Sequence, residues 1–265
     1  NQMHRSPGVF FDHDKGKTHA SGKLLFNCRV IPNRGSWLDF EYDVKDFLYF
    51  KIDRKKKILA STLLLALGYS KSEIVNEFYE KETYTFDTKT EKWKTKFNPD
   101  NYKAKNFSEE VIDAKNGKVV IKLGEKINYL NAKKLHNDGL KDILVSSESL
   151  FGKFLHKDIK ISDDEQGTLK IGTELNEVII NQILENKIYS LEISVTNSIN
   201  KGPYLLITLM NDKNNSKDEA ITEIYKMLRP GEPPTIEIAT QIFNNLFFSS
   251  DRYDLSDVGR VKMNS

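Results

Sequence analysis

The feature that most constrains the fold is a change of hydrophobic period within the first seventy residues. Over residues 37–43 apolar and polar side chains alternate one by one, which is the pattern of a half-buried β-strand. The segments 24–31 and 47–53 are predicted as neighbouring strands. From Ile58 to Leu67 the chain is rich in Leu and Ala, which favours a helix, and Gly68 is suited to end it. The sequence therefore predicts an α+β fold in which an antiparallel sheet is followed by helices.

Helix starts are marked by capping signals. The capping boxes Ser70–Glu73 and Ser216–Glu219 predict two helix starts. Thr235 follows a run of prolines and is predicted to cap a helix that runs through Phe247. The segment 251–260 is predicted as a loop or a single turn. The C-terminal part of the chain is therefore expected to be mostly helical.

The middle of the chain differs in its pattern of predicted elements. Residues 80–198 read as several short strands with two short helices at 131–137 and 175–184, and they contain no catalytic motif. These elements are numerous enough to bury a small core of their own. We therefore predict a smaller inserted α/β module that interrupts a discontinuous domain made of 1–79 and 199–265.

Charge and arginine are unevenly distributed along the 265 residues. The formal net charge is only +2, but residues 1–57 hold twelve Lys or Arg against seven Asp or Glu. The seven arginines all lie within 5–54 and 229–260. Arginine presents a planar fork that suits bidentate and stacked contacts. A basic first segment of this kind predicts an anionic partner such as a nucleic-acid backbone.

Trp37 and the cationic run that begins at Lys51 each allow two interpretations. Composition favours Trp37 as a core residue, whereas an exposed tryptophan beside a turn would offer a stacking surface for a base. The run from Lys51 to Lys57 is either a solvated face or a phosphate-binding face. Composition alone leaves both pairs of alternatives open.

Metal and phosphate chemistry have weak support. Asp12–Asp14 with His4 and His19 has irregular spacing for a metal site, and a solvated polar turn explains it better. A free-standing metal-dependent hydrolase that uses Asp12, His13 and Asp14 is kept as an alternative. Gly16–Thr18 resembles part of a phosphate loop, but Phe11 stands where that loop needs a glycine.

Cys28 is the single cysteine, so a disulfide scaffold is excluded. Its place on a predicted strand indicates a small buried hydrophobe.

The sequence has no apolar stretch long enough to predict a membrane span and no visible signal peptide. The start at Asn1 suggests a segment excised from a longer chain.

Strings at both ends resemble the β subunit of bacterial RNA polymerase. At the first end they are Gln2–Asp12, Asp14–His19 and Arg34–Glu41, and at the second end Arg229–Thr235 and Asn245–Leu255. The resemblance covers 1–79 and 199–265 and is looser over 80–198, where it implies a lineage-specific insertion.

The resemblance implies the lobe of that subunit, which lines the DNA cleft near the downstream duplex and the separated nontemplate strand. It implies a nucleotidyltransferase only as part of the assembled enzyme, with the isolated fragment inactive. The catalytic Mg²⁺ of the family is held by the β′ subunit, so no cofactor is expected in this fragment. The implied partners are DNA and the β′, α, ω and sigma subunits, in the bacterial cytoplasm and without a membrane.

The resemblance also assigns individual residues. Arg5 matches a position in a pocket for a nontemplate-strand guanine, and Trp37 matches a tryptophan that stacks on a neighbouring base. Gln2 matches the edge of the rifamycin-binding pocket. The other matches form a basic strand end near DNA and are Lys51, Arg54, Lys55 and Lys56. The alternatives to this assignment are a free-standing nucleic-acid-binding module and a protein-interaction module that binds through 80–198.

Overall fold

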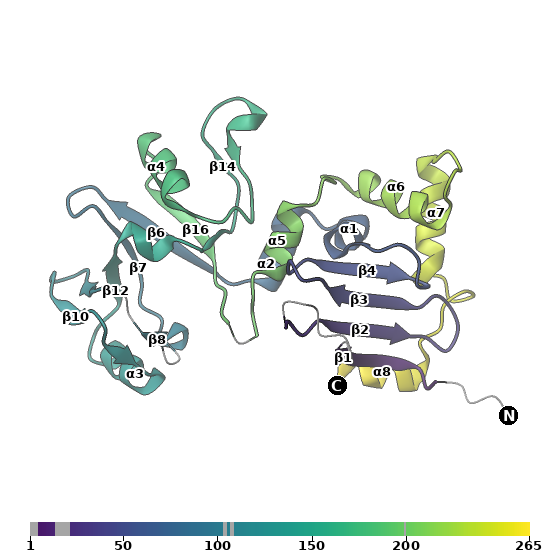
Figure 1. The fold of residues 1–265 in the computed structure, drawn as a ribbon, viewed down its shortest axis with the longest axis horizontal. Coiled ribbons are helices and arrows are strands. Elements are labelled where there is room, and N and C mark those ends of the chain that lie inside the picture. The colour runs from purple at the N-terminus through teal and green to yellow at the C-terminus, as the bar shows by residue number, and fades with distance from the viewer. Residues whose placement is uncertain (1–4, 14–21, 103–104, 107–108, 199) are drawn as a thin grey trace. The chain divides into compact units, whose positions relative to one another are not determined.

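Figure 1 shows the computed structural model, which describes residues 5–13, 22–102, 105–106, 109–198 and 200–265. The chain forms two compact units. Unit 1 combines Asn1–Ile74 with Tyr204–Ser265, and unit 2 is the continuous segment Val75–Pro203. Within the described ranges, no helix is both long and apolar enough to cross a membrane.

The described part of unit 1 is built on a five-stranded antiparallel sheet whose strands follow chain order (Figure 1). The strands are β1 (Gly8–His13), β2 (Phe26–Ile31), β3 (Leu38–Tyr42), β4 (Leu48–Ile52) and β5 (Ile58–Leu59). The alternating segment becomes β3 as predicted, yet Asp39 is only 7% exposed. It is buried because Arg29, its register partner on β2, donates a 2.7 Å hydrogen bond to its carboxylate. The helix predicted from Ile58 begins only at Ala60, because β5 pairs with β4.

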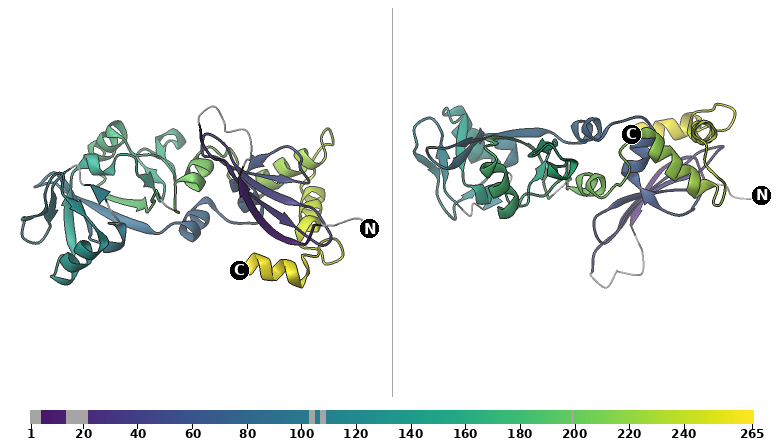
Figure 2. Two further views of the ribbon diagram at one scale, coloured as in Figure 1. Left: turned by 60° about the horizontal axis from the view of Figure 1, so that its bottom comes forward. Right: turned by 90° about the horizontal axis from the view of Figure 1, so that it is seen from above.

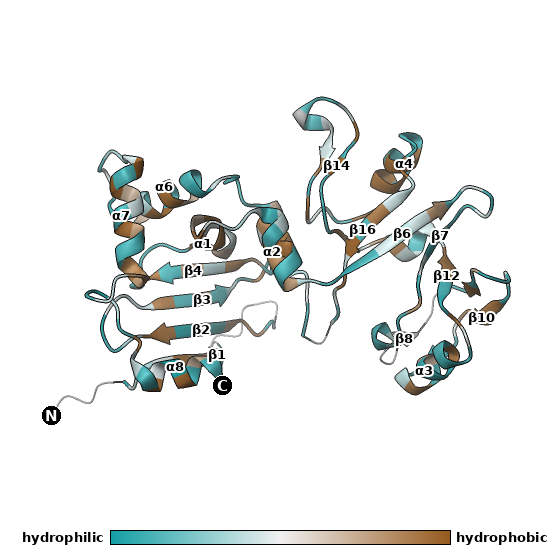
Figure 3. Cartoon of the chain, turned by 180° about the vertical axis from the view of Figure 1, so that it is seen from behind, coloured by the Kyte–Doolittle hydropathy of each residue, from teal (hydrophilic) through white to brown (hydrophobic). Residues whose placement is uncertain are grey.

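Helices pack on β4 and along β1. α1 (Ala60–Ala66) and α5 (Tyr204–Met210) contact β4, α6 (Lys217–Leu228) contacts α1, and α7 (Ile236–Phe247) contacts α6. α8 (Ser256–Asn264) lies along β1 (Figure 2). α2 (Lys71–Phe78) contains the point at which unit 1 passes into unit 2. α1 is buried over most of its length and is largely hydrophobic in Figure 3, as its place between the sheet and α6 requires.

Capping contacts explain where several helices begin. The predicted capping box of α2 forms, since Ser70 and Glu73 exchange side-chain to backbone hydrogen bonds of 2.9 and 3.1 Å. At α6 the Ser216 hydroxyl accepts from the N–H of Glu219. Thr235 directly precedes α7, but its side chain makes no capping hydrogen bond, so that part of the prediction is wrong.

Helix α8 corrects the prediction of a loop over 251–260. Leu255, which precedes it, forms no capping hydrogen bond, but the Ser256 hydroxyl accepts from the N–H of Gly259 at 3.3 Å. Gly259, a poor helix former, lies inside the helix. Glycine permits close packing at this point, since a Cβ there would lie 2.9 Å from Leu255 Cγ and 3.5 Å from Pro7 Cβ. Packing against β1 stabilises this helix, and packing of that kind leaves no local sequence signal.

A buried carboxylate connects α1 with the segment that follows α5. Asp212 is 6% exposed and accepts hydrogen bonds from the hydroxyls of Ser61 and Thr62, the latter at 2.9 Å. Asn214 donates its backbone N–H and its side-chain amide to the same carboxylate at 2.9 and 3.0 Å. Four donors satisfy this carboxylate in the interior of unit 1.

The described part of unit 2 contains a seven-stranded sheet in the order β10-β9-β12-β7-β6-β16-β13. These strands are β6 (Lys81–Asp87), β7 (Lys92–Lys96), β9 (Val111–Asp113), β10 (Val119–Ile121), β12 (Asp142–Val145), β13 (Phe154–Leu155) and β16 (Ser190–Ser194). Two smaller pairs join β8 (Lys105–Asn106) with β11 (Lys126–Ile127) and β14 (Ile159–Lys160) with β15 (Thr168–Leu169). The helices are α3 (Tyr129–Asn137) and α4 (Glu177–Glu185), with 3₁₀ turns η1 (Pro99–Asn101), η2 (Ser147–Leu150) and η3 (Glu165–Gly167). With antiparallel sheets and helices in the described parts of both units, the predicted α+β class is confirmed.

The core of unit 2 holds one buried histidine. His156 is 3% exposed, and its two ring nitrogens lie 2.8 Å from Ser194 Oγ and 2.8 Å from Asn76 Oδ1. Burial is the main reason that the pKa of His156 is lowered from its ordinary value. The neutral imidazole is therefore a packed structural group of unit 2.

Candidate nucleic-acid interface

Strand register brings three of the predicted site residues to one end of the unit 1 sheet. Arg5 precedes β1, Trp37 precedes β3, and Arg54 follows β4. The antiparallel pairings Gly8↔Ile31 and Leu38↔Ile52 place these three chain positions at the same end, toward which the β2 and β4 arrows point in Figure 1. Arg5 is exposed there. Gln2, at the predicted edge of the rifamycin pocket, lies outside the described residues.

A tight turn after β4 holds Arg54 in place. Asp53 and Arg54 have φ values of 49° and 59°, and the N–H of Lys55 closes the turn on the carbonyl of Ile52 at 3.0 Å. Two successive left-handed residues are the signature of a type I′ turn, which favours Asn and Gly. Arginine in this region is strained. The turn therefore places a large cationic side chain at a position where Asn or Gly would have less backbone strain.

The same turn fixes the backbone of Trp37. The N–H of Trp37 donates to the Asp53 carboxylate at 2.9 Å, and the N–H of Asp53 donates to the carbonyl of Trp37 at 3.0 Å. These two hydrogen bonds join the residue before β3 to the turn after β4. Trp37 and Arg54 are consequently positioned together.

Two guanidinium groups lie over the Trp37 ring. The Cζ atoms of Arg29 and Arg54 are 5.5 and 5.3 Å from the ring centroid, within cation–π range. Trp37 is half-buried, so it lies outside the core that composition favoured. Arg29 is held by its hydrogen bond to Asp39, whereas Arg54 is exposed and forms no ion pair with a described residue. One cation over the ring is therefore bonded to a carboxylate, and the other has no ion pair with a described residue.

The predicted lysines of the strand end have different surroundings. Lys51 forms a 3.0 Å ion pair with Glu41, and Lys55 donates to the carbonyl of Leu228, the last residue of α6, at 3.1 Å. Lys56 is exposed and its ammonium group contacts no described polar partner. Among these lysines, only Lys56 is uncommitted within the described part of the chain.

Sequence reasoning missed Arg29, Asp39 and Asp53 as contributors to this site. Arg29 and Asp39 are opposite each other across β2 and β3, so a cross-strand charge pair was the available signal. The role of Asp53 depends on the shape of the turn and had no signal in the sequence.

Two other candidates are the Cys28 thiol and the possible metal site at Asp12–Asp14. Their described residues form neither an activated nucleophile nor a metal site. Burial, followed by the charge of Asp39, raises the pKa of the Cys28 thiol, which is half-buried rather than buried as predicted. Asp12 and His13 lie exposed at the end of β1. Asp14 and the other proposed ligands, His4 and His19, lie outside the described residues, and the described ones include no group of three that could hold a metal ion.

Comparison with known proteins identifies the family of the chain. The family described as RNA polymerase Rpb2, domain 2, matches residues 5–134 and 180–265. The DNA-directed RNA polymerase subunit beta of Rickettsia felis and that of Rickettsia akari are each 48% identical over 264 residues, and that of Rickettsia prowazekii is 47% identical. These matches cover all of this chain but only 19% of each relative. The resemblance inferred from the terminal strings is thereby confirmed, and the chain belongs to the RNA polymerase Rpb2 domain 2 family.

Proposed function

We propose that this chain is the lobe part of the β subunit of a bacterial DNA-directed RNA polymerase and contacts DNA in the assembled enzyme. Its partners are the downstream duplex, the nontemplate strand and the β′, α, ω and sigma subunits, in the cytoplasm. Nucleotidyl transfer, with Mg²⁺ held by β′, is an activity of the whole enzyme, and the isolated chain does not polymerise. The observation that carries this proposal is the Trp37 ring with two guanidinium groups over it, of which Arg29 is bonded to Asp39 and Arg54 forms no ion pair with a described residue.

This arrangement supports an exchange of stacking partners. A base that stacks on the Trp37 ring displaces the Arg54 guanidinium, because Arg29 is held by Asp39. The displaced cation then lies beside the phosphate that accompanies the base. Stacking on an aromatic side chain contributes about 1–3 kcal/mol per base, and the released guanidinium adds a phosphate contact.

The other assigned residues take different parts in the proposed interface. Arg5 pairs with O6 and N7 of a guanine, for which a guanidinium is well suited. Lys56 adds an uncommitted positive charge beside Arg54. Lys51 and Lys55 add to the positive field while they remain bonded to Glu41 and to α6. Gln2 is proposed at the edge of the rifamycin pocket on resemblance alone.

Trp37→Ala in the assembled polymerase tests the stacking role. We expect the lifetime of the promoter open complex to fall by roughly 5- to 100-fold, which corresponds to the loss of one stacked base. Phe47→Ala is the matched control, because Phe47 is a half-buried aromatic in the turn between β3 and β4, at the opposite end of the sheet. An unchanged lifetime for Trp37→Ala would contradict the proposal.

Charge variants test the phosphate contact separately. Arg54→Gln should make the log–log salt dependence of DNA binding shallower by roughly 0.7–0.9, the value for one phosphate contact. Lys45→Gln is the control, since Lys45 is exposed in the turn between β3 and β4, at the opposite end of the sheet. Arg5→Ala should relax the preference for guanine in the nontemplate strand, and an unaltered preference would remove Arg5 from the interface.

We also propose that residues 80–198 are an inserted module of the lobe. The first and last strands of this segment support it, because β6 and β16 pair side by side with Lys81 opposite Ser194. The N–H of Val195 donates to the carbonyl of Glu80 at 2.8 Å, so the chain enters and leaves at nearly the same point. Deleting 80–198 should leave hydrogen-exchange protection in α1 and α6 intact, whereas loss of that protection would refute the module boundary.

A further inference from the structure

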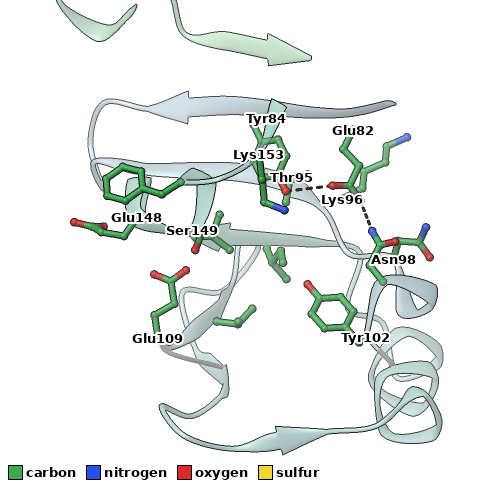
Figure 4. Close-up of a pocket in the computed structure, with 15 residues that line it drawn as sticks. Glu82, Tyr84, Thr95, Lys96, Asn98, Tyr102, Glu109, Glu148, Ser149 and Lys153 are labelled. Atoms are coloured by element: carbon green, nitrogen blue, oxygen red, sulfur yellow. Dashed lines mark hydrogen bonds between the residues drawn. The ribbon is translucent and has the colours of Figure 1, made fainter. Parts of the chain in front are cut away.

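The hairpin of β6 and β7 in unit 2 has one exposed face that is rich in lysine and threonine. On β7, Trp93 and Thr95 are buried. Lys94 and Lys96 alternate with them and are exposed. The buried side is seen in Figure 4, where Thr95 lies beside Tyr84 at a small cavity next to the core. The strand period of two therefore gives this hairpin a core face and an opposite, cationic face.

The cationic face forms one wall of a groove of about 820 Å³. Thr83 and Thr85 of β6 are exposed and line this wall. Helix α3 lines the groove as well, with Tyr129, Lys133 and His136. The volume lies within the range of about 300–1,000 Å³ that is typical of ligand-binding clefts. The groove is therefore large enough to hold a ligand or a segment of a partner.

Positive charge is concentrated in this half of unit 2. Residues 81–141 hold fourteen lysines against nine Asp or Glu, whereas residues 142–198 hold five lysines against ten Asp or Glu. The lysines that line the groove are Lys81, Lys94, Lys96 and Lys133. The carboxylates that line it are Glu82, Asp100 and Asp142. Glu82 is turned toward the core side, where it accepts from the Tyr84 phenol at 3.2 Å. The groove therefore favours an anionic ligand.

The groove lysines are weakly bound to their neighbours. The Lys94 ammonium lies 3.9 Å from the Asp142 carboxylate, and both side chains are well exposed. Lys81 lies 3.5 Å from Glu192, and its side chain is also exposed. Lys96 forms no ion pair with any described residue. Exposed ion pairs of this kind contribute little to stability, so these lysines can exchange their partners for an anionic ligand.

Tyr129 adds an aromatic surface to the groove. Its ring is half-buried, and the Lys133 ammonium lies 5.9 Å from the ring centroid, within cation–π range. Proteins bind single-stranded nucleic acid with this combination, since lysines follow the phosphates and bases stack on aromatic rings. Lys94 and Lys96 are two residues apart on a strand, about 7 Å, which suits successive phosphates of an extended strand. A duplex has no unpaired base for Tyr129, and an acidic peptide would leave the ring unused.

We propose that this groove binds single-stranded nucleic acid. Lys94 and Lys96 contact successive phosphates, and an unpaired base stacks on Tyr129 with Lys133 beside it. All lining residues belong to unit 2, so this site is separate from the proposed contact at Trp37. The chain then has two nucleic-acid contacts, one in each unit.

NMR titration of the full 265-residue chain with an oligothymidylate of about twelve nucleotides tests the site. We expect saturable shifts of the amide resonances of Thr83, Thr85 and Lys94, which report on unit 2 and not on the contact at Trp37. A blunt duplex of about twelve base pairs and a peptide of about twelve glutamates should each bind at least fivefold more weakly at these resonances, because neither places a base on Tyr129.

Variants locate the contacts. Lys94→Gln and Lys96→Gln should each make the log–log salt dependence of binding shallower by roughly 0.7, the value for one phosphate contact on a single strand. Tyr129→Leu keeps an apolar group but removes the ring, and should weaken binding by roughly 5- to 100-fold. Lys170→Gln and Tyr189→Leu are matched controls, because both residues are exposed in unit 2 and line no part of the groove. Melting temperatures show whether each variant remains folded.

Three results would overturn the proposal. The first is the absence of saturable shifts in β6 and β7 with the oligothymidylate in the folded wild-type chain. The second is tighter binding of the glutamate peptide than of the oligothymidylate, which would assign the groove to an acidic protein segment. The third is oligothymidylate binding that Tyr129→Leu and the two lysine variants leave unchanged while all three remain folded.

Discussion

The two compact units each contain one tryptophan and use it in opposite ways. Trp93 in unit 2 is fully buried, and its indole N–H donates to Ser147 at 3.0 Å. Trp37 in unit 1 is half-buried beneath the guanidinium groups of Arg29 and Arg54. The same residue type is thus a core residue in one unit and a surface feature in the other. Neighbouring charges and strand ends decide between the two roles, and hydrophobicity alone does not.

Buried polar groups hold segments together in both units. In unit 1 the Asp212 carboxylate accepts from four donors. In unit 2 the two ring nitrogens of His156 lie 2.8 Å from Ser194 Oγ and Asn76 Oδ1. A carboxylate thus has this role in one unit and a histidine ring has it in the other.

Replacing the two tryptophans should give the largest difference between the units. Trp93→Ala removes a fully buried ring and should lower the free energy of unfolding of unit 2 by about 3–5 kcal/mol. Trp37→Ala should change the stability of unit 1 by about 1 kcal/mol or less, because its ring is partly solvated. Hydrogen exchange of the amides in β7 and β3 measures both effects. Equal losses of unfolding free energy in the two variants would show that Trp37 is as much a core residue as Trp93.

Asp212→Ala should have the next largest effect and should act on unit 1. It removes the acceptor of the Ser61 and Thr62 hydroxyls and one of two carboxylate acceptors of the Asn214 amide, which also donates to Glu223, at a cost of about 3 kcal/mol or more. Urea unfolding followed by amide exchange in α1 measures this loss. Asp251→Ala, an exposed substitution in the same unit, should stay within about 0.5 kcal/mol.

His156→Leu should destabilise unit 2 and also remove a dependence on pH. The substitution leaves Ser194 and Asn76 without their ring partner, at a cost of about 1–3 kcal/mol. Because the pKa of His156 is lowered in the folded state, the unfolded chain binds the proton first. Stability should therefore fall as pH drops from about 6.5, the ordinary pKa of histidine, to the lower folded value.

The pH effect has its own control. Glu192 raises and Lys81 lowers the pKa of His156, and both effects are smaller than that of burial. Protection factors of the β16 amides, which correct for the intrinsic pH dependence of exchange, should differ between pH 7.5 and 5.5 in the wild-type chain and differ less in His156→Leu. The control variant His136→Leu, on α3, should keep the wild-type difference between the two pH values. If His156→Leu also kept that difference, His156 would be excluded as its cause.

A matched pair of threonines gives the smallest expected effect. Thr62→Val removes a 2.9 Å hydrogen bond to Asp212 and should cost about 1–2 kcal/mol. Thr95→Val removes a buried hydroxyl that lies beside the Tyr84 phenol and should cost less, about 0.5 kcal/mol or less. Thermal unfolding of both variants measures the difference. An equal loss at position 95 would mean that the contact between Thr95 and Tyr84 is as strong as the hydrogen bond between Thr62 and Asp212.

Local signals predicted much of the fold. The alternation over residues 37–43 becomes β3, and the Ser70–Glu73 capping box forms with both of its hydrogen bonds. These patterns are determined by residues close in sequence, so they are readable without a structure. Helix α8 was missed because Gly259, a poor helix former, lies inside it and packs closely there, although Ser256, which caps its first turn, was an available signal.

The candidate sites were predicted in part. Trp37 and Arg54 follow from resemblance, but the sequence does not indicate that Arg29 is held by Asp39 over the same ring. That contact requires the register of β2 and β3.

The turn at Asp53 and Arg54 has a consequence for how this surface changes in evolution. An Asn-Gly pair would relax the left-handed backbone and stabilise the turn, yet it would remove the carboxylate that binds the Trp37 N–H and the cation over the ring. Selection for stability alone would therefore erase the proposed contact surface. Consensus or stability-guided redesign of this lobe should hold both positions fixed, since here the most stable sequence and the functional one diverge.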